Sequence, residues 1–194
     1  MSQYALLAFS AWSSRALILW RVHLNSQQSL YINGNVPCPV LMVSIKRRAS
    51  VACKIEDSFE YVADWKNYKS FIPMFLDIEP MSLVHYGPGT SLVVLLALGR
   101  MEVKTTLEVS EFQKNKKITI KATKGIRLRA TWEFKDIGDK VLITLDFDYD
   151  LPAGLSSRED QKELLEKELD DSAVRSMELL KWVLESNVGE TDGY

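Results

Sequence analysis

Few residues of this sequence combine a reactive side chain with a position expected to point inward. The chain has only two histidines, His23 and His85, and two cysteines, Cys38 and Cys53. Neither histidine lies near a serine that we expect inside the protein, so a serine–histidine–aspartate arrangement is not supported. The set is too small for a zinc site. We therefore predict no metal, no cofactor and no catalytic residue.

The polar groups that we do expect inside are hydroxyls. Thr105 and Tyr149 fall on the apolar faces of predicted strands, and Ser172 and Ser176 fall on the apolar stripe of a predicted helix. No aspartate, glutamate, lysine or histidine falls on these faces, and proton transfer in a cavity needs such a group. We expect the hydroxyls to orient a bound molecule rather than to transform it.

A structural interpretation competes with this functional one. A buried tyrosine such as Tyr149 usually finds its partner within the protein. Ser172 and Ser176 are small, and this could simply let Trp132 and Phe147 pack closely against the helix. The alternative is that the small residues leave space for a guest molecule. The sequence leaves both interpretations open.

Strands that alternate apolar and polar residues must position these hydroxyls. Alternation with period two is typical of a sheet with one apolar face. With a two-residue loop at Ile137-Gly138, Arg129 would lie opposite Asp146 and Arg127 opposite Asp148, which sets the register of the last two strands. The segments that show the alternation are Met101–Val109, Ile126–Phe134 and Val141–Leu151.

A long amphipathic helix is predicted after the last strand. A capping box at Ser156–Glu159 and Gly189 beyond the far end indicate about thirty helical residues, or roughly 45 Å. The apolar face of the sheet needs a cover, and this helix is the only segment of sufficient length. A curved antiparallel sheet around one long helix tends to enclose a cavity.

Local signals predict the remaining elements. Asp57 with Glu60 is a capping-box pattern, and Asp64 can cap a second short helix that Pro73 ends. Pro80 places the strand at Leu76–Val84 on a sheet edge or at a bulge. The strand at Ser91–Leu98 is almost entirely apolar, which predicts cover on both faces or a subunit contact.

Residues 1–41 differ from the rest of the chain. They contain no acidic residue, and Arg15 and Arg21 are their only charges. Arg15 would lie near the middle of a spanning helix, and no positive charge precedes the first apolar run as a secretory signal requires. A leader with serine and arginine and no acidic residue resembles an organelle transit peptide, although its arginine content is low. We expect a poorly ordered extension, or translation that starts at Met42. Residues 189–194 are predicted to be a tail.

Charge and cysteine content limit the partners and the location. The net charge of −2 gives no electrostatic case for a nucleic-acid partner. Two cysteines do not make a disulfide framework, and reduced thiols are typical of the cytoplasm. We expect a cytoplasmic protein whose main partner is a hydrophobic small molecule.

Several motifs resemble those of the START-related helix-grip superfamily. The sequence FEYVADWKNYKSFIP at 59–73 resembles the segment that follows the first strand in that superfamily. Further similarities are the turn Tyr86–Thr90, the segment Gly125–Phe134 and the segment Asp148–Pro152. The nearest groups are the polyketide cyclase/dehydrase and lipid transport group and the coenzyme Q-binding START-like group.

The resemblance implies an α+β helix-grip fold over residues 42–188: a curved antiparallel sheet of about seven strands around the long C-terminal helix, with two short helices after the first strand. It also implies a hydrophobic cavity between sheet and helix. We expect the cavity to be lined by Met101, Val103, Thr105, Leu128, Trp132, Phe134, Leu145, Phe147, Tyr149, Ser172, Ser176 and Leu179. We expect its mouth at Tyr68, Phe71, Ile72 and Phe75.

The leading interpretation is binding or transport of a lipid, isoprenoid, quinone or polyketide-like molecule. One alternative is an enzyme of the polyketide cyclase/dehydratase type, in which cavity shape folds a reactive chain. A second alternative is a protein-interaction module of the coenzyme Q-binding START-like type. The apolar residues at the mouth could cap the core, or form a lip that contacts a membrane or another protein transiently.

Overall fold

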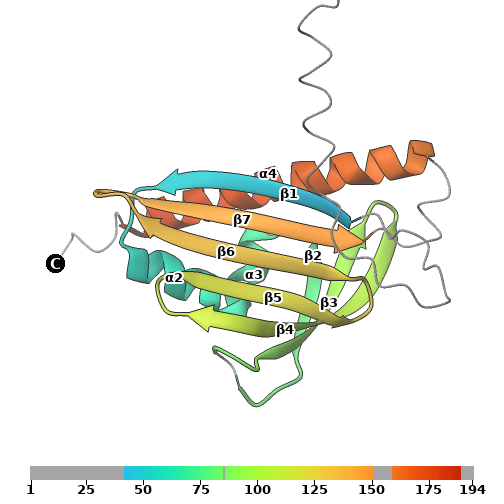
Figure 1. Cartoon of the computed structure of the whole chain (residues 1–194), viewed down its shortest axis with the longest axis horizontal. Helices are drawn as coiled ribbons and strands as arrows, with labels where there is room; N and C mark the ends of the chain where they lie inside the picture. Colours follow the sequence, from blue (N-terminus) through green and yellow to red (C-terminus); the bar gives the residue numbers. More distant parts are fainter. Residues whose placement is uncertain (1–41, 85, 151–158, 189–194) are drawn as a thin grey trace, which may run out of the picture. The chain divides into compact units, whose positions relative to one another are not determined.

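The computed structural model describes residues 42–84, 86–150 and 159–188. A seven-stranded antiparallel sheet and one long helix dominate this part of the chain (Figure 1). The strand order is β1-β7-β6-β5-β4-β3-β2, so the first strand lies beside the last. In chain order the elements are β1 (Met42–Val51), α2 (Ile55–Ala63), the 3₁₀ helix η1 (Trp65–Asn67), α3 (Tyr68–Phe71), β2 (Phe75–Pro80), β3 (Ser91–Leu98), β4 (Met101–Gln113), β5 (Lys117–Lys124), β6 (Leu128–Asp136), β7 (Val141–Asp150) and α4 (Glu159–Val188).

The predictions for residues 1–41, for a cap at Ser156 and for the tail at 189–194 lie outside the described residues.

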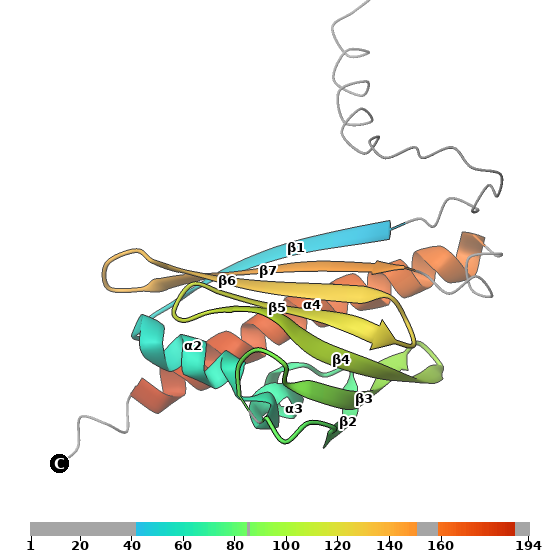
Figure 2. The ribbon, with the colours of Figure 1, turned by 60° about the horizontal axis from the view of Figure 1, so that its bottom comes forward.

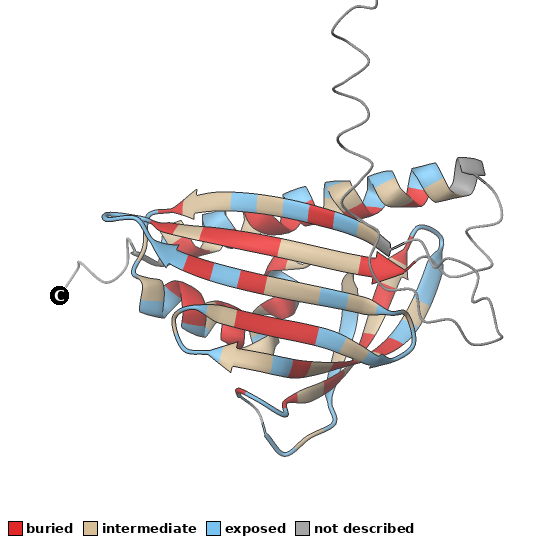
Figure 3. Ribbon diagram, viewed as in Figure 1, coloured by how far each residue is buried: buried red, intermediate tan, exposed pale blue. Residues whose placement is uncertain are grey.

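Helix α4 crosses one face of the sheet, and α2 and α3 lie on the same side (Figure 2). This is the helix-grip arrangement expected from the sequence, and the prediction is confirmed. Burial alternates along β3 and along Thr105–Val109 of β4 as the pattern predicted (Figure 3). β5 and β7 depart from it, because each buries three consecutive residues: Ile118, Thr119 and Ile120 in β5, and Ile143, Thr144 and Leu145 in β7. β3 buries only every second side chain, so it has one covered face rather than two. The apolar stripe of α4 that is buried against the sheet consists of Leu165, Leu169, Ala173, Met177, Leu180 and Leu184.

The start of α2 differs from the prediction. The helix begins at Ile55, and Lys54 occupies the N-cap position without a side-chain bond to the backbone. Asp57 therefore lies within the first helical turn, and the predicted capping box is wrong. The strand that precedes the helix ends at Val51, so the short connection leads into the helix before Asp57 is reached. A carboxylate in the first turn still interacts favourably with the helix dipole.

The cap at Asp64 and the end of α3 agree with the sequence, whereas the strand predicted at Leu76–Val84 is Phe75–Pro80 and ends four residues earlier. Asp64 accepts a hydrogen bond from the backbone N–H of Lys66 at 3.0 Å, as a cap should. α3 ends at Phe71, two residues before Pro73. β2 ends at Pro80, lies at the edge of the sheet and shows a register shift.

The predicted register of the β6–β7 hairpin is wrong by two residues. Arg129 lies opposite Asp148, not Asp146, and Arg127 forms an ion pair with Asp150 at 3.5 Å. The loop consists of the four residues 137–140 instead of two. A hydrogen bond of 2.9 Å joins its first N–H to its last carbonyl, and the longer loop shifts every pair in the hairpin.

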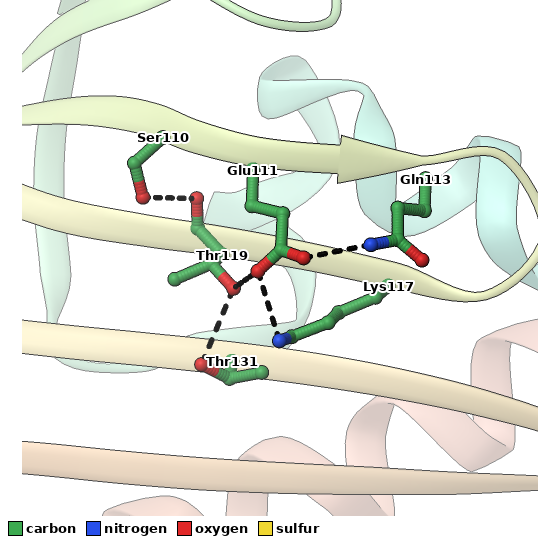
Figure 4. A network of polar contacts seen from close by, with 6 residues as sticks. All are labelled: Ser110, Glu111, Gln113, Lys117, Thr119 and Thr131. Carbon is green, nitrogen blue, oxygen red and sulfur yellow. Dashed lines mark hydrogen bonds and ion pairs between the residues drawn. The ribbon is translucent and has the colours of Figure 1, made fainter.

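The sheet face away from α4 carries a polar network at the β4–β5 pair (Figure 4). The Glu111 carboxylate accepts hydrogen bonds from Lys117 at 2.8 Å, Gln113 at 2.8 Å and Thr119 at 3.3 Å. The bond from Lys117 is the main reason why the pKa of Glu111 lies below its usual value. These bonds link β4 to β5 at the bulge that follows Val109, so the role of the network is structural.

Candidate functional site

A cavity of about 50 Å³ lies between the sheet and the middle of α4. It has room for roughly three to five water molecules, at about 10–15 Å³ each. Ligand pockets are usually much larger, roughly 300–1,000 Å³. Its lining is almost wholly apolar and comes from α3, the α3–β2 connection, the sheet and α4. The lining residues are Tyr68, Ile72, Met74, Phe75, Leu96, Leu107, Ile120, Leu128, Ala130, Trp132, Leu145, Phe147, Leu169, Ser172, Ala173 and Ser176.

Two serines one turn apart on α4 provide hydroxyls in this lining, and they differ in their bonding. Ser176 Oγ donates a hydrogen bond to the backbone carbonyl of Ser172 at 2.8 Å. Ser172 Oγ is buried and has no hydrogen-bond partner. A buried hydroxyl without a partner costs free energy, so Ser172 is the position where a ligand atom would gain most by bonding.

Tyr68 is the one lining residue with a titratable side chain. It is fully buried, and burial is the main reason why its pKa is raised, with the Asp64 carboxylate adding to the effect. Its phenol therefore stays neutral at physiological pH. The lining offers apolar surface and hydroxyls, which suits binding by burial rather than acid–base chemistry. Within the described ranges, no group of three or more metal-ligating side chains lies close together.

The structure brings together part of the predicted cavity set. Six of the predicted lining residues line this cavity, and so do three of the four predicted mouth residues. Their role toward a ligand remains a prediction. The six are Leu128, Trp132, Leu145, Phe147, Ser172 and Ser176, and the three are Tyr68, Ile72 and Phe75.

The other predicted residues lie elsewhere. Tyr149 lines a separate space of about 10 Å³ next to the cavity, and its hydroxyl is buried without a partner. Met101 is 37% exposed. Phe134 packs against Phe59 with ring centres 5.3 Å apart, and Phe71 packs edge-on against Trp132 at 5.8 Å.

The remaining three, Val103, Thr105 and Leu179, do not line the cavity. Thr105 is buried and lies beside the turn at Gly125. The two residues are so close that a Cβ added to Gly125 would lie 2.8 Å from Thr105 Oγ1. Its hydroxyl has no partner. Val103 and Leu179 are half-buried and pack against the core.

The inward position of Arg47 was missed, and the predicted set omitted seven residues that line the cavity: Met74, Leu96, Leu107, Ile120, Ala130, Leu169 and Ala173. Met74 lines the cavity from the connection before β2, where no periodic pattern identifies an inward position. Arg47 faces α4, where it forms an ion pair with Asp170, and its Nε is buried without a partner. A signal for Arg47 existed, since it alternates with Ile45 and Ala49 on the inner face of β1.

A larger hollow, about 840 Å³, is an open groove at the other end of α4. It lies between the β1–α2 connection, the β6–β7 loop and Leu184, and many of its lining residues are charged. Cys53 lies in it half-buried, and burial raises the pKa of its thiol. A protonated thiol is a poor nucleophile, so the environment of Cys53 does not activate it.

These observations define a class of protein: an antiparallel sheet that wraps one long helix and holds an apolar cavity between them, a fold suited to hydrophobic ligands. The chain belongs to the polyketide cyclase / dehydrase and lipid transport family, whose model matches residues 42–181. A comparison with curated protein sequences gives no match.

Solved structures share the fold at low identity. An aromatase/cyclase from Streptomyces sp. R1128 superposes with a TM-score of 0.65 at 15% identity, over 76% of this chain and 96% of its own. A START superfamily protein from Mycobacterium smegmatis gives 0.54 at 15% identity, over 76% and 97%. A norcoclaurine synthase from Thalictrum flavum gives 0.58 at 14% identity, over 78% and 99%. Among the described residues, no helix is long and apolar enough to span a bilayer.

Proposed function

We propose that residues 42–188 bind one hydrophobic small molecule between the sheet and α4. The observation that carries this proposal is the unpartnered Ser172 hydroxyl in an otherwise apolar cavity. Trp132, Leu145 and Phe147 would contact the apolar body of the guest, while Ser172 would hydrogen-bond one polar atom. Burial supplies the affinity, at about 25 cal/mol for each Å² of apolar surface removed from water.

The small volume means that binding must widen the cavity. Met74 and Phe75 are half-buried side chains at its border. A methionine adapts its shape readily because its side chain is unbranched. We propose a carrier or binding protein rather than an enzyme, because the described lining offers apolar side chains and hydroxyls and no carboxylate, amine or imidazole that could transfer a proton.

Native mass spectrometry of the full chain, before and after organic extraction, tests this function. We expect a loss of mass equal to one small molecule, which mass spectrometry of the extract then assigns to a lipid, isoprenoid, quinone or polyketide class. The emptied protein should bind the neutral apolar dye N-phenyl-1-naphthylamine. Absence of both an extracted molecule and dye binding would contradict the proposal.

A matched pair of variants locates the guest. S172A should weaken dye binding roughly threefold to tenfold, because one hydrogen bond contributes about 0.5–1.5 kcal/mol. S176A should change it less than twofold, because the Ser176 hydroxyl already bonds to the backbone. Equal effects of the two substitutions would show that Ser172 does not contact the guest.

A further inference from the structure

A second pocket of about 250 Å³ adjoins the cavity and is more open to solvent. It lies between the α3–β2 connection, the β3–β4 turn and the first half of α4. Three residues, Met74, Leu169 and Ser172, line both spaces and therefore form the wall between them. The other residues of this outer pocket are Pro73, Ala97, Leu98, Gly99, Leu165 and Glu168.

The wall between the two spaces can open through side chains alone. The backbone around Met74 is held in place: the Met74 carbonyl accepts a hydrogen bond from Ala97 N–H at 2.9 Å, and Phe75 N–H donates to the Ile72 carbonyl at 3.1 Å. The Met74 side chain has several rotatable bonds and can swing without moving that backbone.

The polar groups along this route lie in one row on α4. Glu168, Ser172 and Ser176 are spaced by four residues, so they follow one another along one face of the helix. Glu168 is exposed at the outer pocket, Ser172 lies at the wall, and Ser176 lies inside. Among the described residues that line the two pockets, Glu168 is the only one with a charged side chain.

The position of the Glu168 carboxylate is set by the β3–β4 turn. Gly99 has a φ of 61°, and a Cβ added there would lie 3.1 Å from Glu168 Oε2. The carboxylate therefore lies directly over the turn at the edge of the outer pocket. It can accept hydrogen bonds from a ligand and repels an anion.

Resting on the proposed function, we infer that the guest is an apolar molecule that ends in a hydroxyl or an amine, not in a carboxylate or phosphate. Its apolar part extends past Met74 into the cavity. Its polar end remains in the outer pocket, where the Glu168 carboxylate accepts its hydrogen bond. Ser172 lies one helical turn further along the same face of α4, at the wall between the two spaces.

Calorimetric titration of the full-length protein with decan-1-ol, decylamine and sodium decanoate at pH 7.5 tests the inference. We expect decanol and decylamine to bind, and decanoate to bind at least about tenfold more weakly because two like charges come close. In E168Q, decanoate should bind within about threefold of decanol. The control E178Q removes an exposed carboxylate of α4 that lies outside both pockets, and it should leave the order unchanged.

Two results would overturn the inference while leaving the proposed function intact. One is decanoate binding as tightly as decanol in the unaltered protein. The other is tighter decanoate binding that R100Q abolishes, which would assign the polar end to the exposed arginine of the β3–β4 turn. If none of the three probes binds, and neither an extracted molecule nor dye binding is found, the proposed function fails as well.

The route past Met74 has its own test. M74A should raise the association rate of decanol severalfold in stopped-flow fluorescence, while the order of the three affinities stays the same. Trp132 lines the cavity and reports on its filling. An unchanged association rate would show that the guest enters elsewhere.

Discussion

Filling the cavity with protein should stabilise the fold and weaken binding together. Ala173 lies on the buried face of α4 and lines the cavity. A173V adds two methyl groups beside a space of about 50 Å³. Burying two such groups contributes about 1.6 kcal/mol, and the lower helix propensity of valine costs about 0.6 kcal/mol. We expect the free energy of unfolding to rise by up to about 1 kcal/mol.

The same substitution removes space that the guest needs. A guest that loses contact for two methylene groups loses about 1.6 kcal/mol of binding free energy, or more than tenfold in affinity. Denaturant unfolding measures the first effect, and titration with N-phenyl-1-naphthylamine measures the second. The control A49V adds the same two groups on the inner face of β1, outside the cavity lining, and should leave dye affinity unchanged.

Two outcomes would refute this reasoning. Destabilisation by more than about 1 kcal/mol would mean that the space beside Ala173 is already filled, because overpacking typically costs about 1–3 kcal/mol. A stabilised A173V protein with unchanged dye affinity would mean that the guest does not bind between α4 and the sheet.

Three further predictions concern stability. G125A should lower the free energy of unfolding by at least about 2 kcal/mol in denaturant unfolding, because Gly125 has a φ of 89° and an added Cβ would lie 2.7 Å from a backbone oxygen. The control G138A, at a φ of 97° with open space around it, should lower it by only about 1 kcal/mol. Burial, with the carboxylates of α4 adding to it, raises the pKa of Tyr149 to about 12. The favourable contribution of the neutral Tyr149 phenol is complete below pH 10 and is lost as pH rises toward 12. Y149F should therefore lose about 1–2 kcal/mol less stability than the unaltered protein over that range in unfolding measurements. The pKa of Glu111 is lowered, chiefly by Lys117, so its contribution is present above its usual pKa of 4.5 and is lost as pH falls through the lowered value; K117M should flatten the acid limb of the unfolding profile.

Each of these three has a contradicting result. Equal losses in the two glycine variants would show that the close backbone contact at Gly125 carries no cost. An alkaline profile of Y149F identical to that of the unaltered protein would place the Tyr149 phenol in solvent. An unchanged acid limb in K117M would mean that the ion pair in the polar network does not persist in solution.

The sheet, its inner face and its helical cover followed from the sequence because side-chain direction alternates strictly along a strand. Trp132, Leu145 and Phe147 were assigned to the interior on that basis, and all three line the cavity. The helix cap at Asp64 and the helix end before Pro73 were also predictable from the sequence, because each depends on the backbone of only a few neighbouring residues.

Loop length was less accessible to sequence reasoning. The β6–β7 loop has four residues where two were predicted, and the pairs of Arg127 and Arg129 moved with it. Both loop lengths keep the same side chains on the inner face, because a shift of two residues preserves the alternation. The hydrophobic pattern therefore could not distinguish between them.

The cavity itself depended on tertiary structure. Its volume is the small difference between the space under α4 and the side chains that fill it, and packing contacts of Ala173 and Ser172 with distant strands decide that difference. Met74 reaches the site from the connection before β2, where no repeat marks the inward direction, and Glu168 reaches it as an exposed residue at the edge of the helix stripe. Periodicity thus determined which face of each element is apolar, whereas the distance between α4 and the sheet determined what space remains and which polar groups border it.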